Sequence, residues 1–343
     1  MLAPRIRSPG VLAVLLLVGC PPPGDKGVDT DTDTDTDTDT DTDTDTDTDT
    51  DTDTDTDTDT DTEPTFEALT GDASFSEATD LIAGDGVIYV AGVNTSGEAM
   101  IASIDDATGA LTSIYEGDPL VMPSGLCLSN SGRVLYIADV AAETDDGTTN
   151  GGVFALSLED GSISEIGAAG LIDLPTDVTL AGDGYTLYVV GYNLDGEATI
   201  FDVNTGSGAW GEAYSGYPLT EPLQIDVNSA GTELFLLDAM ANGGGWGALY
   251  SFTQPTFALT KLGGGFRTPG LGGLAVDEAS ELLYYTKSGS PALVAFATDG
   301  SGFEVVDDLG LMSIPTGVGA TADAVYVSDA GPDASNDVYV LRY

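Results

Sequence analysis

The chain has 343 residues, a formal charge of −50 and no histidine. So strong a negative field repels phosphate backbones, which excludes nucleic-acid binding as a function class. The lack of histidine removes the commonest general base and a common metal ligand.

The N-terminus carries Arg5 and Arg7, followed by the apolar run VLAVLLLV at 11–18. Eight residues are too few to cross a bilayer, which takes about 20, and they are typical of a signal peptide. The run ends in LVGC at 17–20, which resembles the bacterial lipobox. That resemblance implies cleavage before Cys20 and a membrane anchor through acyl chains on Cys20. Because Pro21 is not Asp, it further implies an outer membrane lipoprotein facing the periplasm or the cell exterior. The alternative is an ordinary signal peptide with an incidental cysteine.

Seventeen Asp-Thr pairs follow, from Asp29 to Thr62. They offer nothing apolar to bury, so this segment is predicted to be a disordered acidic linker. Successive Asp charges lie about 7 Å apart, within the Debye length of about 8 Å, so mutual repulsion should stretch the linker into a stalk. Loose Ca²⁺ binding and O-glycosylation of the Thr residues are alternatives. The sequence thus divides into a signal peptide at 1–19, the lipidated Cys20 with its stalk at 20–62, and a folded domain at 63–343.

The folded domain repeats a pattern of four short strands about every 47 residues. Its clearest marker is an aromatic residue in a strand of the LYV type, at Tyr89, Tyr136, Tyr188, Phe235, Tyr284 and Tyr326. Six such units predict an all-β, six-bladed β-propeller with four-stranded blades. The last unit stops after its third strand, so a strand at 65–70 is expected to close the last blade and remove its open edge. A parallel β-solenoid would have shorter repeats.

A proline opens five of the units, at Pro123, Pro175, Pro222, Pro269 and Pro315. Together with patterns such as SNSGRVLYIAD at 129–139, these units resemble the NHL, YVTN and SMP-30/gluconolactonase-like propellers over 65–343. The resemblance implies the fold and leaves the chemistry open, since propellers host many functions. It implies a ligand site at one mouth of the central channel, in a monomeric ring.

Several polar and aromatic residues are expected at that mouth. The candidate binding residues are Glu77, Asp139, Asp177, Gln224, Asp238, Trp246, Lys287 and Asp329, with Thr79, Asp80, Asp145, Asp146, Asn150, Asp333 and Asp337 nearby. Asp139, Asp238 and Asp329 occupy alternate blades at the same offset from the aromatic marker. They could hold Ca²⁺ or another divalent cation, or cap the loops that follow them. Trp246 could stack on a sugar, pack on a partner or cover the blade end. Cys127 is predicted to be a small buried hydrophobic residue.

The resemblance to SMP-30-like lactonases implies a divalent metal held by one Glu and by Asn or Asp residues at the starts of inner strands. Glu77 stands where the Glu is expected. Leu223 and Gly270 stand where an Asn and an Asp are expected, which argues against lactonase activity. The sequence therefore favours a lipid-anchored binding or scaffolding module that meets an envelope protein or glycan. The alternatives are a metal-dependent hydrolase of the SMP-30/gluconolactonase type and a structural surface-layer component.

Overall fold

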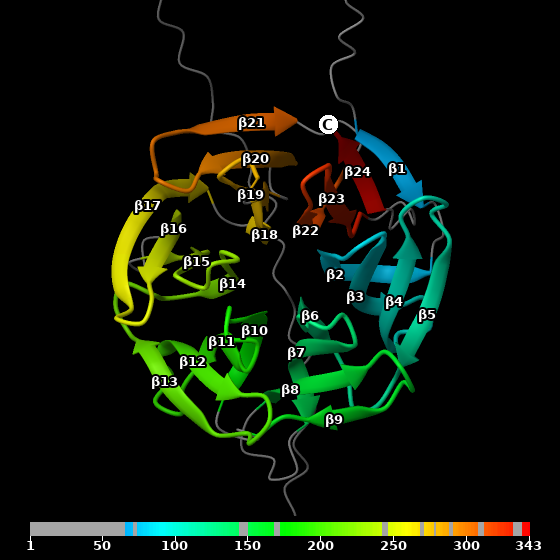
Figure 1. Cartoon of the computed structure of the whole chain (residues 1–343), viewed down its shortest axis with the longest axis horizontal. Helices are drawn as coiled ribbons and strands as arrows, with labels where there is room; N and C mark the ends of the chain where they lie inside the picture. The colour runs from blue at the N-terminus through cyan, green and yellow to red at the C-terminus, as the bar shows by residue number, and fades with distance from the viewer. Residues whose placement is uncertain are drawn as a thin grey trace, which may run out of the picture. The chain divides into compact units, whose positions relative to one another are not determined.

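The computed structural model describes residues 66–70, 74–143, 150–167, 172–241, 246–267, 271–277, 279–287, 291–307, 312–331 and 338–343. Cys20 and the Asp-Thr segment lie outside these residues. Between Pro64 and Tyr343 the chain forms one compact unit of six four-stranded antiparallel sheets, arranged as the blades of a ring (Figure 1). The predicted six-bladed, all-β propeller is confirmed.

Each blade runs from an inner strand beside the ring axis to an outer strand at the rim (Figure 1). Blade 1 contains β2 (Phe75–Ala83), β3 (Val87–Asn94), β4 (Ala99–Asp105) and β5 (Leu111–Glu116). Blade 2 contains β6 (Pro123–Leu128), β7 (Val134–Glu143), β8 (Asn150–Ser157) and β9 (Ile163–Glu165). Blade 3 contains β10 (Asp173–Leu180), β11 (Thr186–Tyr192), β12 (Ala198–Asn204) and β13 (Trp210–Ser215).

The second half of the ring follows the same order. Blade 4 contains β14 (Pro222–Val227), β15 (Glu233–Asp238), β16 (Trp246–Thr253) and β17 (Ala258–Arg267). Blade 5 contains β18 (Leu271–Asp277), β19 (Leu282–Lys287), β20 (Ala292–Ala297) and β21 (Phe303–Asp307). Blade 6 contains β22 (Pro315–Ala320), β23 (Ala324–Asp329), β24 (Val338–Arg342) and, as its outer strand, β1 (Phe66–Thr70).

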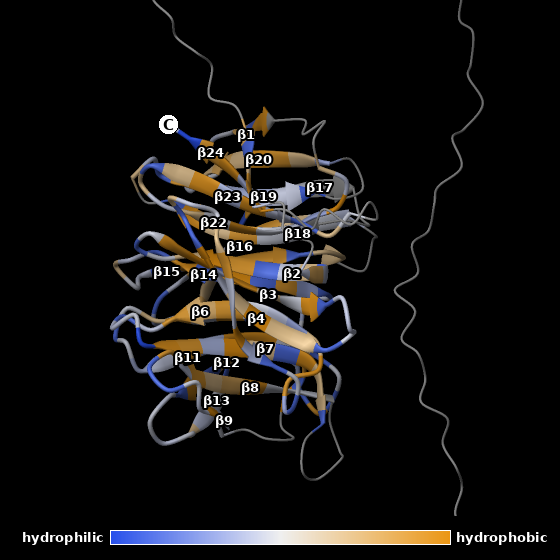
Figure 2. Cartoon of the chain, turned by 90° about the vertical axis from the view of Figure 1, so that its right-hand side faces the viewer, coloured by the Kyte–Doolittle hydropathy of each residue, from blue (hydrophilic) through white to orange (hydrophobic). Residues whose placement is uncertain are grey.

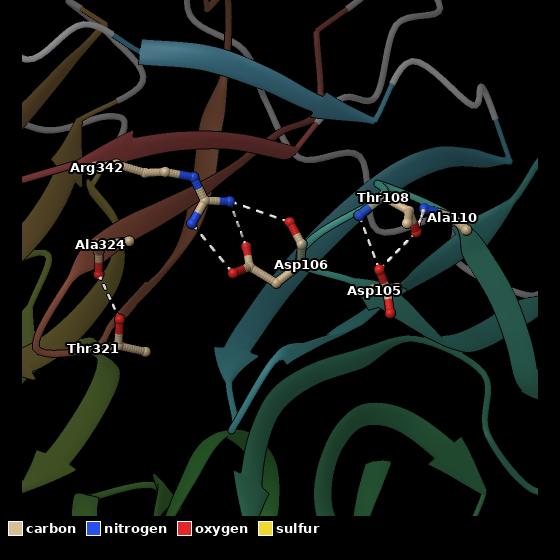
Figure 3. A network of polar contacts seen from close by, with 7 residues as sticks. All are labelled: Asp105, Asp106, Thr108, Ala110, Thr321, Ala324 and Arg342. Atoms are coloured by element: carbon tan, nitrogen blue, oxygen red, sulfur yellow. Dashed lines mark hydrogen bonds and ion pairs between the residues drawn. The ribbon is translucent and has the colours of Figure 1, made fainter.

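The ring is closed by the pairing of strands from the two ends of the chain, as the sequence predicts. β1 pairs antiparallel with β24, with Phe66 opposite Leu341. Arg342 at the end of β24 also reaches Asp106, in the turn after β4 of blade 1 (Figure 3). Closure leaves neither end of the folded chain as an unpaired strand edge, the feature that promotes aggregation of β proteins.

The strands form here because their apolar residues can be buried on both faces. Hydrophobic residues concentrate in the strands, and hydrophilic residues in the connecting turns (Figure 2). Central strands such as β15 are almost wholly buried, whereas the outer strand β5 is largely exposed. The inner-to-second-strand turns use glycines with positive φ, as at Gly132 and Gly231, a conformation that costs glycine little.

The hydrophobic core consists of layers between neighbouring blades. One cluster joins Cys127 and Tyr136 of blade 2 to Val178 and Leu187 of blade 3. The expected burial of Cys127 is confirmed, at 5% exposure. Because each layer needs both neighbours, the inner strands are held at fixed positions around the channel. Within the described residues, no helix is long and apolar enough to cross a membrane.

Candidate functional site

The register of the inner strands places equivalent residues of the six blades side by side around the channel. We number these positions from the residue at which the regular inner strand begins. The first positions are Ala78, Pro123, Pro175, Pro222, Leu271 and Pro315; the third positions are Asp80, Gly125, Asp177, Gln224, Gly273 and Gly317. The fifth positions are Ile82, Cys127, Thr179, Asp226, Ala275 and Gly319.

Blade 5 corrects one sequence expectation. Leu271 pairs with Lys287 as Pro315 pairs with Asp329, so Leu271 rather than Pro269 holds the first position. Gly272 is therefore the second-position residue that was expected at Gly270. The glycine-rich segment GLGG offers no side chain that could have fixed this register from the sequence.

Side-chain hydroxyls at the second position tie adjacent blades together. Thr79 Oγ1 donates to the carbonyl oxygen of Pro123 at 2.5 Å, and Ser124 Oγ donates to that of Pro175 at 3.0 Å. The same link recurs from Thr176 to Pro222 at 2.9 Å and from Thr316 to Ala78 at 2.9 Å. Blades 4 and 5 interrupt the series, because their second positions are Leu223 and Gly272.

Three aspartates form a second set of links, on the channel side. Each inner strand has a free edge, and its N–H groups need acceptors. Asp80 Oδ2 accepts from Leu126 N at 2.8 Å, and Asp177 Oδ2 accepts from Ile225 N at 2.8 Å. In the same way Asp226 Oδ2 accepts from Val276 N at 2.9 Å. Each carboxylate thus caps an edge N–H of the next blade.

These aspartates line a cavity of about 160 Å³ in the channel. Its polar side chains are those of Asp80, Asp177, Asp226, Gln224, Thr179 and Cys127. The rest of its lining is aliphatic or glycine, and no Lys or Arg of the described chain contributes to it. Among the described residues, the cavity lining is therefore rich in oxygen acceptors and includes no basic side chain.

Burial and mutual repulsion disfavour ionisation of these carboxyl groups. Burial raises the pKa of Asp80 to about 8; N–H groups of Leu126 and Leu81 oppose the rise, and the charge of Asp226 adds to it. Burial likewise raises the pKa of Asp177 well above its ordinary value, and the charge of Asp80 adds to that shift. The pKa of the Cys127 thiol is also raised, mainly by burial, which keeps it from acting as a thiolate nucleophile.

Gln224 is a polar cavity residue whose side chain makes no hydrogen bond that stabilises the described fold. It holds the third position of blade 4, equivalent to Asp80 and Asp177, and it is only 8% exposed. Within the described part of the chain its amide makes no hydrogen bond, although it lines the cavity. Buried amides are normally hydrogen-bonded, so an unused one facing a cavity is a functional signal.

Asp139, Asp238 and Asp329 lie on the second strands of their blades, each paired with the first residue of the inner strand, and cap backbone groups. Asp139 accepts from the N–H groups of Val121, Met122, Ala141 and Ala142, at 2.7–3.1 Å. Asp238 accepts from Thr220, Glu221 and Met240, and Asp329 from Ser313 and Ile314. These bonds favour the capping interpretation over the cation one. Among the described residues, no three Asp, Glu, Cys or His side chains are placed to hold a metal ion directly.

The second-strand residue that faces the first inner-strand position is Asp in blades 2, 4 and 6 and Gly in blade 1, and this difference has a steric cause. In blade 1 the equivalent residue is Gly92, where a Cβ atom would lie 2.1 Å from the carbonyl oxygen of Glu77. There the incoming strand β2 runs straight past the position. In blades 2, 4 and 6 the inner strand is shorter, and the bend before it needs a carboxylate cap.

The remaining candidates are more scattered. Glu77 is exposed on β2 and does not line the cavity, Lys287 is partly exposed at the end of β19, and Trp246 is 48% exposed at the start of β16. Asp145, Asp146, Asp333 and Asp337 lie outside the described residues, as does the Asn150 side chain. Of the predicted mouth residues, the structure thus brings Asp177, Gln224 and Asp80 together at one cavity.

Asp226 and Thr179 are the cavity residues that the sequence reading missed. They are fifth-position residues of blades 4 and 3, two residues beyond Gln224 and Asp177 on the same strand face. Thr179 Oγ1 donates to Asp226 Oδ1 at 3.3 Å. The alternation in QID at 224–226 was the available signal, because residues two apart in a strand share a face.

The residues do not fit the metal site that the lactonase resemblance implies. Glu77 is exposed and away from the cavity, while Leu223 and Gly272 hold the positions expected to supply Asn and Asp. An aliphatic side chain and a glycine supply no side-chain oxygen ligand, so two of the implied donors are missing.

No protein-family profile and no curated protein sequence matches the chain. Many solved structures share its fold. A gluconolactonase from Xanthomonas campestris is 10% identical, with a TM-score of 0.60, over 81% of this chain and 89% of its own. The calcium-binding protein regucalcin from Agrobacterium tumefaciens is 16% identical, with a TM-score of 0.54, over 81% and 93%. An auxiliary nutrient binding protein from Bacteroides thetaiotaomicron is 12% identical, with a TM-score of 0.59, over 79% and 70%. At such identities the likeness shows the fold alone: a six-bladed β-propeller related in architecture to gluconolactonase-like proteins.

Proposed function

We propose that this protein is a lipid-anchored binding module of the bacterial cell envelope, with a monomeric propeller carried on an acidic stalk. The observation that carries binding over hydrolysis is the second position of the inner strands. Its hydroxyls in blades 1, 2, 3 and 6 bond to the next blade, and blade 4 holds Leu223 there. The second-position side chains thus hold neighbouring blades together and do not form a set of metal ligands.

The anchor and the stalk are supported by the sequence alone. Cys20 follows a short apolar run and begins a segment that ends in 17 Asp-Thr pairs. Acylation at Cys20 would attach the chain to a membrane, and a self-repelling stalk would hold the propeller away from the membrane surface. We place the protein at the outer membrane, facing the periplasm or the exterior.

Charge and exposure suggest what the propeller binds. Residues 63–343 contain 40 acidic and five basic residues, which disfavours anionic partners. Trp246 and Lys287 lie at the same end of the adjacent blades 4 and 5, both at least partly exposed. An exposed indole can pack on an apolar protein surface or stack on a sugar ring. The partner is therefore an envelope protein or a glycan without strong negative charge.

The anchor is tested by labelling cells with radioactive palmitate. Wild-type protein should incorporate the label and partition into the detergent phase, whereas Cys20→Ser should do neither. Equal labelling of both proteins would reject Cys20 as the attachment site. Protease treatment of intact cells then separates a periplasmic propeller from one on the exterior.

Partner binding is tested by cross-linking the full chain in envelope extracts. We expect one partner to be recovered with wild type and to fall several-fold with Trp246→Ala. Trp210→Ala is the matched control, because Trp210 is similarly exposed, at 40%, but lies on the outer strand of blade 3. Equal recovery with both variants would place the binding surface elsewhere.

The second candidate is a metal-dependent hydrolase, favoured by the architecture shared with a gluconolactonase and by two buried carboxyl groups in the channel. Its test is hydrolysis of aldonolactones with Ca²⁺, Mn²⁺ or Zn²⁺. We expect no rate above the buffer control. A protein-dependent rate that disappears in Asp177→Ala would replace the binding proposal by the hydrolytic one.

A further inference from the structure

The central cavity carries an inference that goes beyond partner binding and does not depend on it. We propose that Asp80, Asp177, Asp226 and Gln224 form a site for one small cation that brings its own hydrogen-bond donors. Two sources share this chemistry: a hydrated divalent metal ion, whose water ligands donate, and the ammonium group of a small amine. The site differs from the lactonase-type metal position, which would involve Glu77 and the second positions of blades 4 and 5.

Charge is the first argument. Asp80, Asp177 and Asp226 come from blades 1, 3 and 4, and all three line one cavity to which no Lys or Arg of the described chain contributes. Asp80 and Asp177 are 4% and 3% exposed. Neither of these two buried carboxyl groups pairs with a Lys or Arg of the described chain. Each must therefore take up a proton or a cation, because burying a free carboxylate ion costs several kcal/mol.

Gln224 is the second and independent argument. A carboxylate cluster that only took up protons would need no further acceptor, yet the fold places an amide at 8% exposure against the same space. Its carbonyl oxygen has two free lone pairs, because the amide bonds to no described residue. The equivalent residues of blades 2, 5 and 6 are glycines. At the third position, blade 4 therefore supplies a hydrogen-bond acceptor, whereas three of the six blades have glycine there.

The remaining acceptors point to the same ligand class. Asp177 uses one backbone N–H on each oxygen, from Val178 and Ile225, which leaves a second lone pair on each. Asp226 and the Thr179 hydroxyl add further oxygen atoms. A ligand that fills these sites must donate hydrogen bonds in several directions, and an anion or a pure acceptor would be repelled.

Size decides between a bare ion and a larger cation. The cavity of about 160 Å³ exceeds the share of about 30 Å³ that one water takes in the liquid, so it holds an ion with part of its water shell or a small alkylammonium. No three acidic groups of the described chain are placed to coordinate a bare ion. The side chains should therefore contact the water or ammonium hydrogens and not the metal centre.

The test is titration calorimetry of the full chain at pH 8 and constant ionic strength with four probes. MgCl₂, CaCl₂ and methylammonium chloride can donate hydrogen bonds, directly or through water. Tetramethylammonium chloride has the same charge as methylammonium and no such donor. We expect one saturable site per chain for at least one of the first three and none for the fourth. The Asp-Thr segment adds a weak background that is the same for every variant.

Three variants connect the binding to the cavity. Asp177→Asn should weaken the saturable site by about tenfold or more, the worth of one charge-assisted hydrogen bond, and Gln224→Met by about threefold or more. Gln224→Met removes no internal hydrogen bond, so its folding should match wild type by circular dichroism. Glu212→Gln removes one exposed charge from the outer strand β13 and should leave the affinity unchanged within about twofold.

The outcomes separate cleanly. Binding of the metal ions alone, or of methylammonium alone, supports the site and identifies its source; binding of both supports the shared chemistry. A titration with no saturable component overturns the proposal. So does a site that is unaffected by Asp177→Asn and Gln224→Met, or one that accepts tetramethylammonium equally well. None of these results bears on recovery of the envelope partner.

Discussion

Arg342 forms an ion pair with Asp106 across the seam where the last blade meets the first. Arg342 Nη2 lies 2.7 Å from Asp106 Oδ1 and 3.1 Å from the Asp106 carbonyl oxygen, while Nη1 lies 3.2 Å from Oδ2 (Figure 3). Arg342 belongs to β24, the strand that pairs with the N-terminal β1. The ion pair therefore reinforces the joint that closes the ring.

The Arg342–Asp106 ion pair should make a small, salt-sensitive contribution to stability. Both side chains are partly solvated, so Arg342→Ala should cost about 1 kcal/mol or less and lower the thermal midpoint by about 1–4 °C. The loss should shrink in 0.5 M NaCl. Arg133→Ala is the control, because Arg133 pairs with Glu159 within blade 2 and both are more than 60% exposed. If both variants lowered the thermal midpoint equally, the ion pair at the seam would contribute no more than an ordinary surface pair.

Gly125 should tolerate no side chain. A Cβ atom there would lie 2.5 Å from the Asp177 Cα and 2.2 Å from its Oδ1. Gly125→Ala must push blades 2 and 3 apart, so we expect a loss of about 1–3 kcal/mol, measured by urea unfolding. Gly302→Ala is the matched control, since a Cβ there meets nothing within 4 Å. A Gly125→Ala protein as stable as Gly302→Ala would contradict the close approach of these blades.

The sequence predicts the ring better than the cavity, and the reason is the range of the interactions. Six aromatic markers and the missing last strand follow from local alternation, so the blade count and the pairing of β1 with β24 were accessible. The blade 5 register was not, because LGG at 271–273 carries no distinguishing side chain. Asp177 and Gln224 were found as strand-start residues. Their convergence with Asp226 depends on how three blades meet at the axis, which no single repeat encodes.

Stability should fall as the pH rises, because two cavity acids hold protons more tightly when folded. The pKa of Asp80 is about 8 in the folded chain against 3.8 as its ordinary value, and the pKa of Asp177 is also raised. The folded state then binds more protons between about pH 4 and pH 8. Its stabilisation is complete below about pH 4 and is lost as the pH rises through about 8.

Thermal scans at pH 5 and pH 8 in a chelating buffer check this sign. The groups that face Asp80 in the cavity are Asp177, Asp226 and Cys127, all acidic, so none reverses the trend. General repulsion among surface carboxylates adds a slope of the same sign. Asp80→Asn separates the two, and its midpoint should fall by about 5 °C less than that of wild type. Identical slopes in both proteins would mean that Asp80 is ionised throughout.

Asp238 offers a test of capping against cation binding. Its carboxylate accepts hydrogen bonds from the N–H groups of Thr220, Glu221 and Met240, so Asp238→Ala leaves three partly buried donors unsatisfied and should cost about 2–3 kcal/mol. The cost should be the same in EDTA and in 5 mM CaCl₂, because a backbone cap needs no ion. Asp238→Asn retains one acceptor oxygen and should recover part of the loss. If CaCl₂ instead stabilises the wild type and Asp238→Ala abolishes that gain, the carboxylate serves a cation, and the equivalent residues Asp139 and Asp329 become the next ligands to test.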